Sequence, residues 1–138
     1  MRFYTCHYST IGLATGAMVS GSPLICGGWS SSGIHDECYF MDLEQKSWKF
    51  LTNMGTKRAE SASVAIKTSL FVTGGHDGGE PLSTTEYIHA DGNILTGPDL
   101  PSPRAGHCMV ALPSGKAMII GGYATNKATL GHLVGLNN

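Results

Sequence analysis

The sequence predicts an all-β protein in which a four-stranded unit is repeated about three times. A glycine pair follows a short apolar run at three places, and the first glycines of these pairs, Gly27, Gly74 and Gly121, are 47 residues apart. A repeat of this length indicates a stacked or radial architecture. Turn residues also interrupt the chain at roughly 8 to 12 residue intervals, and no segment keeps a helical apolar period. Short strands are therefore expected throughout.

The repeat divides the chain into four predicted segments. We interpret residues 1–11 as a remnant or the last strand of a preceding unit. The three repeats that follow cover residues 12–58, 59–104 and 105–138, and the third of them is incomplete.

The middle repeat contains all four strands. They are predicted near residues 63–66, 70–73, 85–88 and 94–96. A tight turn at Ala90-Asp91-Gly92-Asn93 joins the last two, because glycine supplies the positive φ of a hairpin turn. The runs at 70–73 and 117–120 are apolar at nearly every position, which predicts a sheet covered on both faces.

The other two repeats follow the same register with departures. Trp48 and Ile94 each lie ten residues before an arginine, and Tyr39 and Tyr87 are interpreted as matching positions of the third strand. The first repeat lacks an arginine before its first strand. After Tyr123 no third or fourth strand is recognisable, and residues 131–138 are interpreted as the start of a strand that is cut short.

Composition excludes several classes. The formal net charge is −1, and no basic run steers the chain toward nucleic acid. With 41% hydrophobic residues the chain can bury a core. No apolar run approaches the roughly 18 residues of a membrane span, and residues 1–10 are too polar and aromatic for a signal peptide. We therefore expect neither nucleic-acid nor membrane binding.

These features together resemble the kelch repeat. The match is fullest where Gly74-Gly75 is followed by Tyr87 and by the proline-rich turn that ends at Arg104. The resemblance covers roughly residues 12 to 125. It implies that each repeat is one four-stranded blade, so the chain is expected to form a partial β-propeller of roughly three antiparallel blades in an open arc.

The resemblance implies structural roles for the motif residues. The glycines permit positive φ and close approach of neighbouring atoms. The aromatic side chains fill gaps between adjacent blades, and the arginines reach acceptors in the next blade or hold the turn between blades. These residues are Gly27, Gly28, Tyr39, Trp48, Arg58, Gly74, Gly75, Tyr87, Arg104, Gly121 and Gly122.

Three blades are fewer than the roughly four to eight of a closed propeller. An open arc exposes two apolar sheet faces and unpaired strand edges. We therefore interpret the chain as a fragment of a longer propeller whose further blades cover these faces. Self-association is the alternative.

Cys26 and Cys38 are placed at neighbouring positions of two antiparallel strands. They are expected either to form a disulfide or to pack as two reduced, buried thiols. A disulfide would indicate an extracellular location, and reduced thiols a cytoplasmic one. The four cysteines contain no Cys-x-x-Cys and the six histidines no ligand spacing, so neither a metal site nor a cofactor is predicted.

The kelch resemblance implies a non-catalytic scaffold that binds a protein partner of unknown identity through loops on one face. The expected loops are residues 29–36, 76–82 and 123–128, with the connections 53–57 and 97–103. The alternative is a fragment of a galactose-oxidase-like copper radical oxidase whose catalytic residues lie mostly outside this chain. The candidate binding residues are Trp29, Ser31, His35, His76, Asp77 and Tyr123.

Overall fold

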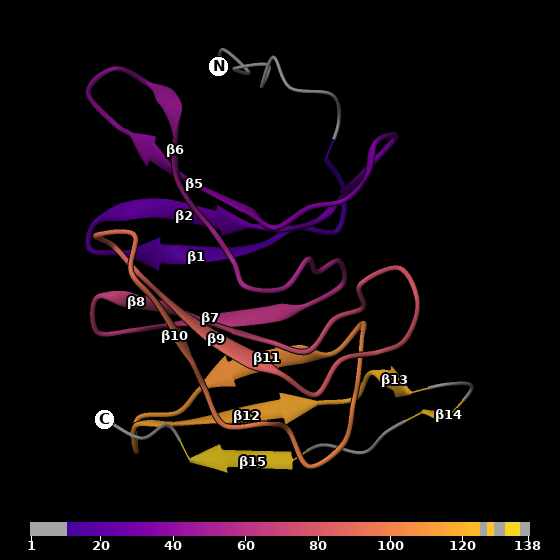
Figure 1. Cartoon of the computed structure of the whole chain (residues 1–138). Helices are drawn as coiled ribbons and strands as arrows, with labels where there is room; N and C mark the ends of the chain where they lie inside the picture. The colour runs from indigo at the N-terminus through magenta and orange to yellow at the C-terminus, as the bar shows by residue number, and fades with distance from the viewer. Residues whose placement is uncertain (1–10, 125–126, 129–131, 136–138) are drawn as a thin grey trace, which may run out of the picture.

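The computed structural model describes residues 11–124, 127–128 and 132–135, and within these ranges the chain forms strands and no helix (Figure 1). The strands form antiparallel sheets stacked through the molecule, which confirms the predicted all-β class. The strand interpreted within residues 1–10 lies outside the described residues. The described residues contain no helix of the length and hydrophobicity that a membrane span requires.

Three sheets make up the stack. The first sheet consists of β1 (Thr15–Val19), β2 (Ser22–Cys26), β5 (Glu37–Asp42) and β6 (Ser47–Asn53). The second sheet consists of β7 (Ala62–Ile66), β8 (Ser69–Thr73), β9 (Thr85–His89) and β10 (Ile94–Thr96). The third sheet consists of β11 (Cys108–Ala111), β12 (Lys116–Ile120) and β15 (His132–Gly135).

Two small hairpins complete the fold. They are β3 (Trp29–Ser30) with β4 (Gly33–Ile34), and β13 (Tyr123–Ala124) with β14 (Lys127–Ala128). Each follows the second strand of its sheet. Tight turns join the sheet strands at the opposite end: Ser20 and Gly21 between β1 and β2 both have positive φ (49° and 83°), as a two-residue hairpin turn requires.

One apolar core lies between the first and second sheets. It contains Leu24, Cys26 and Cys38 from the first sheet, packed against Leu70 and Ile88 from the second. Cys26 and Cys38 are cross-strand partners, and they form a disulfide. The bond joins β2 to β5 inside this core, which decides between the two alternatives left open by the sequence.

A second core lies between the second and third sheets. Val64 and Phe71 pack against Ala117 there, and the ring of Tyr87 stacks on Phe71 at a centroid distance of 4.4 Å. Because β8 is used by both cores, all five of its residues are buried. The two-sided coverage predicted for residues 70–73 is confirmed.

The same prediction is wrong for residues 117–120. Burial alternates along β12: Ala117 and Ile119 are fully buried, whereas Met118 and Ile120 are 38% and 46% exposed. The second sheet covers only one face of this strand. β12 therefore carries apolar side chains on both faces, although no described residue covers one of these faces.

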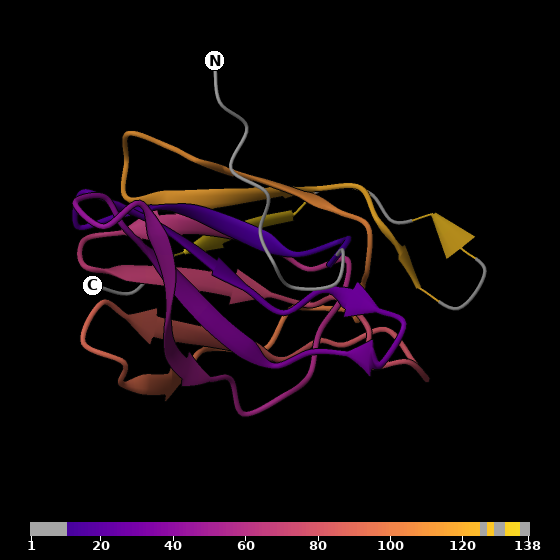
Figure 2. The ribbon, with the colours of Figure 1, turned by 90° about the horizontal axis from the view of Figure 1, so that it is seen from above.

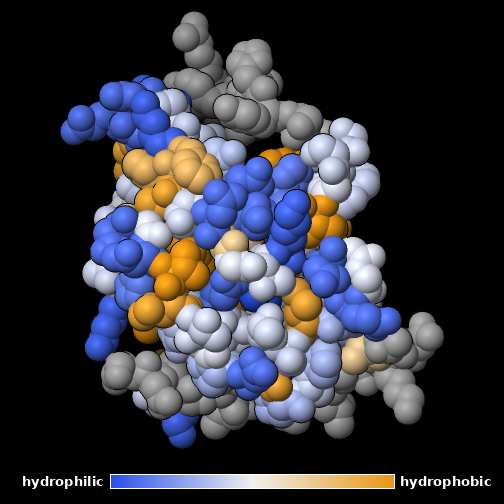
Figure 3. All heavy atoms as spheres, in the orientation of Figure 1, coloured by the Kyte–Doolittle hydropathy of each residue, from blue (hydrophilic) through white to orange (hydrophobic). Residues whose placement is uncertain are grey.

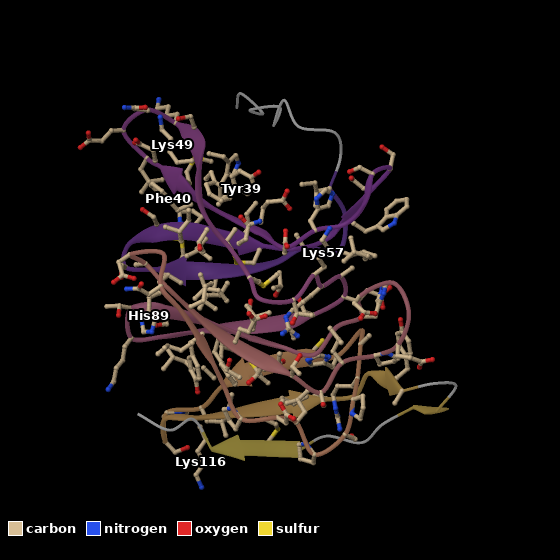
Figure 4. All side chains as sticks on the ribbon, viewed as in Figure 1. Tyr39, Phe40, Lys49, Lys57, His89 and Lys116 are labelled. Atoms are coloured by element: carbon tan, nitrogen blue, oxygen red, sulfur yellow. A yellow bond between two sulfur atoms is a disulfide. The ribbon has the colours of Figure 1, made fainter. Side chains whose placement is uncertain are left out.

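The structure corrects two further interpretations. Tyr39 pairs with Ile25, two residues before Gly27, whereas Tyr87 pairs with Phe71, three residues before Gly74. Phe40, the neighbour of Tyr39 on β5 (Figure 4), is therefore the counterpart of Tyr87. The matching of Tyr39 with Tyr87 was wrong because the shared aromatic character hid a shift of one residue.

The third repeat does have a third strand. β15 pairs antiparallel with β12, and His132 lies opposite Ile119. The run between Gly131 and Gly135 is too short for its sequence to identify it as the third strand of the repeat, and its place is set by the pairing with β12. The segment predicted as the start of a cut-short strand thus completes a third ladder, while residues 131 and 136–138 lie outside the described residues.

Each sheet sends its loops to one end and its tight turns to the other. The β3–β4 hairpin, residues 74–84 and the β13–β14 hairpin all lie at the right-hand end in Figures 1 and 2, called here the loop end. Lys49, His89 and Lys116 lie toward the turn end (Figure 4). In the space-filling view, hydrophobic residues reach the surface as separate patches among hydrophilic ones (Figure 3).

Candidate protein-interaction surface

The glycine pairs bind the connections that lead into the following sheet. Gly28 N donates to the carbonyl oxygen of Arg58 (2.7 Å), and Gly75 N donates to that of Arg104 (2.9 Å). Gly27 and Gly74 have φ of 64° and 55°, and a Cβ atom on either would collide with the same arginine carbonyl. Glycine is needed at both positions because the connection packs directly on the backbone.

The Arg58 side chain continues this link into the second sheet. Its guanidinium donates from Nη1 to the carbonyl oxygens of Gly74 (2.9 Å) and Thr84 (3.0 Å). Nε and Nη2 donate to Oε2 of Glu86 at 3.0 and 2.7 Å. Arg58 is fully buried and Glu86 nearly so. This one residue therefore joins the loop of the first sheet to the loop of the second.

Arg104 occupies the same place one repeat later. Its Nη1 donates to the carbonyl oxygen of Gly121 at 3.0 Å and its Nη2 to the hydroxyl of Ser102 at 2.9 Å. The residue at the register position of Glu86 differs between repeats. His132 stands at the Glu86 position of the third sheet, and Tyr39 at that of the first. The first repeat, which has Ile11 where the others have arginine, thus also lacks the carboxylate.

Three ring-bearing residues occupy equivalent positions at the loop end. Trp29, His76 and Tyr123 each lie two residues after the first glycine of their pair. Each exchanges two backbone hydrogen bonds of 2.8–3.0 Å with the connection before the first strand of its repeat. The residues of the connection that make these bonds are Gly12, Ala59 and Ala105 respectively. Paired backbone bonds therefore fix the points from which these three side chains project.

The first loop is held by side chains behind Trp29. The buried hydroxyl of Ser30 lies 2.7 Å from Nε2 of His35, whose Nδ1 lies 3.2 Å from the carboxylate of Glu37. The backbone N–H of Glu37 and then His35 hold the pKa of this carboxyl below its usual value. His35 therefore lies partly buried in the loop support, whereas Trp29 (51% exposed) and Ser31 project outward.

The second loop places Asp77 at the surface. Its Oδ1 accepts a hydrogen bond from Gly79 N (2.9 Å), and this bond lowers the pKa of the Asp77 carboxyl. His76 is partly buried, and its Nδ1 accepts a bond from Gly78 N (3.2 Å). A Cβ on Gly78 would lie 3.6 Å from Ile34 of the first loop, so the first and second loops are adjacent.

Glu60 connects the second loop to the third. The Tyr123 hydroxyl donates to Oε2 of Glu60 at 2.8 Å, and Oε1 lies 3.9 Å from Nε2 of His76. The bond to Glu60 raises the pKa of the Tyr123 phenol. Tyr123 remains 42% exposed. The three loops therefore form one continuous surface, with Glu60 between two of its rings.

Glu60 was missed by the sequence analysis. It stands two residues after Arg58, as Gly106 does after Arg104, and both have positive φ (53° and 63°). The constant offset from arginine was the available signal. Of the candidates, Trp29, Ser31, Asp77 and Tyr123 lie exposed at the loop end, and His35 and His76 are partly buried there.

Of the predicted motif aromatics, Tyr87 lies between two sheets and Tyr39 does not. Tyr39 packs edge-on against Phe50 of its own sheet at a centroid distance of 5.8 Å. Trp48 lies beside Met41 on the same ladder, half-buried. The described part of the chain holds no group of three or more His, Cys, Asp or Glu side chains arranged to bind a metal ion.

Comparisons with known proteins agree with the architecture. Residues 57–93 match the kelch motif. The chain is 32% identical over 123 residues to the Rho GTPase-activating protein gacHH of Dictyostelium discoideum, covering 77% of this chain and 8% of that protein. It is 26% identical over 99 residues to the spermatocyte protein spe-26 of Caenorhabditis elegans, covering 68% of this chain and 17% of that protein. The chain thus spans less than a fifth of these relatives.

Proposed function

Because this chain is a partial kelch-repeat propeller, we propose that it is a non-catalytic scaffold that binds a protein partner through its loop end. The observation that carries the proposal is the set of equivalent rings, Trp29, His76 and Tyr123, projected from one surface. Paired backbone bonds hold all three residues. A rigid platform with exposed aromatic side chains is favourable for binding, because little conformational entropy is lost on association.

Two of these rings have the chemistry of interface anchors. Trp29 and Tyr123 are 51% and 42% exposed. Tryptophan and tyrosine are enriched among the residues that dominate binding energy at protein interfaces. Tyr123 is also restrained by Glu60, so its ring is presented in a defined orientation. The partner is therefore expected to bury these two side chains and to contact the loop residues around them.

A comparison of variants tests this function. Tagged wild-type chain, the variant Trp29→Ala with Tyr123→Ala, and the control Leu43→Ala are used to capture proteins, which are identified by quantitative mass spectrometry. Leu43 is 56% exposed and lies in the β5–β6 turn, at the other end of the molecule. For a purified captured protein, we expect Kd to rise about thirty-fold or more in the double variant, from loss of about 2 kcal/mol. Equal affinity for all three chains contradicts the proposal.

A further inference from the structure

The stack of sheets ends in two apolar faces. On β12 the buried Ala117 and Ile119 face the second sheet, so by strand alternation Met118 and Ile120 lie on the opposite face. Val110, the cross-strand partner of Met118, lies there too and is 48% exposed. We call Val110, Met118 and Ile120 the third-sheet outer face.

The first sheet has a comparable face. Leu24 and Leu51 pack into the core shared with the second sheet, so their neighbours on the strands point the other way. Met18 and Phe50 are 57% and 56% exposed on that side. We call it the first-sheet outer face, formed by Met18, Ile25, Tyr39, Met41, Trp48 and Phe50.

These two faces correspond in strand register to the two surfaces that pack against each other between the first and second sheets. Counted from the glycine pairs, Met118 and Ile120 are the counterparts of Leu24 and Cys26, which face the second sheet. On the first sheet, Ile25, Met41 and Trp48 are the counterparts of Val72, Ile88 and Ile94, which face the first sheet. The third-sheet outer face therefore has the register of a surface that fits the first-sheet outer face.

A backbone ladder near the first strands extends in the same direction. Glu60 N donates to the carbonyl oxygen of Leu13 (3.1 Å), and Gly106 N donates to that of Glu60 (2.9 Å). All three residues have positive φ, between 53° and 63°. Each repeat thus donates one bond to the repeat before it. The ladder would continue if the backbone N–H of Leu13 in a second copy of the chain donated to the carbonyl oxygen of Gly106.

We propose that two copies of this chain pair head to tail, with the third-sheet outer face of each packed on the first-sheet outer face of the other. The result is a ring of six sheets about a two-fold axis. The number of copies follows from the sheets of the described residues: propellers contain about four to eight blades, the described residues of each chain form three such sheets, and a third copy would make nine. A head-to-tail contact generates a ring if its rotation closes and an open filament if it does not. The proposal does not depend on the loop-end function.

Sedimentation equilibrium of the 138-residue chain at micromolar concentration tests the stoichiometry. We expect a single species with twice the mass of one chain. A monomer at all concentrations overturns the proposal, and so does a series of growing polymers, since an open head-to-tail contact does not close.

Two variants test the arrangement of the faces. Val110→Lys alters only the third-sheet outer face and Phe50→Lys only the first-sheet outer face, and both positions are half exposed, so each chain is expected to fold. In a two-fold ring every interface carries the changed face. Each variant alone is therefore expected to be monomeric, whereas the matched control Leu43→Lys, at an equally exposed turn residue, remains a dimer.

Mixing the two variants gives the decisive result. One interface then combines two unaltered faces, so an equimolar mixture is expected to form a two-chain complex that is weaker than the wild-type dimer. This complex also shows that both variants are folded. The head-to-tail arrangement is overturned if both variants remain dimers with the affinity of the wild-type chain. It is also overturned if the mixture stays monomeric while near-ultraviolet circular dichroism shows that both chains are folded.

Discussion

Arg58 and Arg104 are the largest fully buried side chains in the described part of the chain. Burying a guanidinium is costly unless its donors are satisfied. For Arg58 two backbone carbonyls and the carboxylate of Glu86 provide the acceptors, and Glu86 also accepts a bond from Gly55 N at 2.6 Å. The planar guanidinium of Arg58 can donate to both carbonyls and to the carboxylate at once, whereas an ammonium group has too few donors for these bonds.

Substitution Glu86→Gln removes the charge that compensates Arg58. We expect the free energy of unfolding to fall by about 3–5 kcal/mol, because an uncompensated buried charge remains. Urea unfolding followed by circular dichroism measures the change. Glu44→Gln, at an exposed turn position, is the matched control and is expected to change stability by about 0.5 kcal/mol or less. Equal effects of the two substitutions would contradict the role given to Glu86.

His107 is a second buried polar residue, with Nε2 2.8 Å from the hydroxyl of Thr73. Burial, followed by the charge of Arg104, lowers the pKa of His107 from 6.5 to about 4. The unfolded chain therefore binds a proton between these values that the folded chain does not. The contribution of His107 to the free energy of unfolding is therefore fully present above pH 6.5 and is lost as the pH falls toward 4.

The pH dependence of unfolding checks this assignment. Between pH 7 and 4, protonation of His107 is expected to lower the free energy of unfolding by up to about 3 kcal/mol, because its pKa is roughly 2.5 lower in the folded chain than in the unfolded chain. Carboxylates also titrate in this range, so the relevant quantity is the difference between wild type and His107→Asn, measured by urea unfolding at each pH. We expect that difference to shrink at low pH; a difference independent of pH would refute the assignment.

At the scale of secondary-structure elements, the disulfide fixes β5 against β2 where the ladder is irregular. A bulge lies between Cys38 and Tyr39 in the pairing of β5 with β6. Both sulfur-bearing residues are buried in the core against the second sheet. The covalent bond therefore holds the strand in register where its hydrogen bonding to β6 is interrupted.

Removal of the bond is expected to reduce the stability of the first sheet. For a sequence separation of 12 residues, loss of the cross-link in Cys26→Ala with Cys38→Ala should lower the free energy of unfolding by about 3 kcal/mol. Denaturant unfolding without reductant measures it, with Cys108→Ala, at an exposed free cysteine, as the control. Four reactive thiols in unreduced, denatured wild-type chain would exclude the bond altogether.

At the scale of the whole molecule, the second sheet is the only one covered on both sides by described residues. It shares one core with the first sheet and a second with the third. Stability in such a stack is close to a sum over neighbouring interfaces. The end sheets consequently gain from any surface that covers Phe50 or Met118, which is the physical reason that the proposed dimer stabilises its own subunits.

The amino-acid sequence by itself determined the all-β class, the 47-residue repeat and the strands of the middle unit. Local chemistry carries that information: glycine pairs require positive φ, and short apolar runs end at turn residues. Cys26 and Cys38 could also be placed on neighbouring strands, but their bond was left undecided. The kelch resemblance also implied that Arg58 and Arg104 reach acceptors in the next blade or hold the turn between blades.

Only the tertiary structure decided what depends on register and packing. One residue of shift makes Phe40, not Tyr39, the counterpart of Tyr87, because alternation sends neighbouring side chains to opposite faces. Glu86 as the partner of Arg58, and Glu60 beside Tyr123, are contacts between residues far apart in the chain. An apolar strand has the same sequence pattern whether or not a sheet covers it. The exposure of Met118 could therefore be known only from the position of its strand in the last described sheet of the stack.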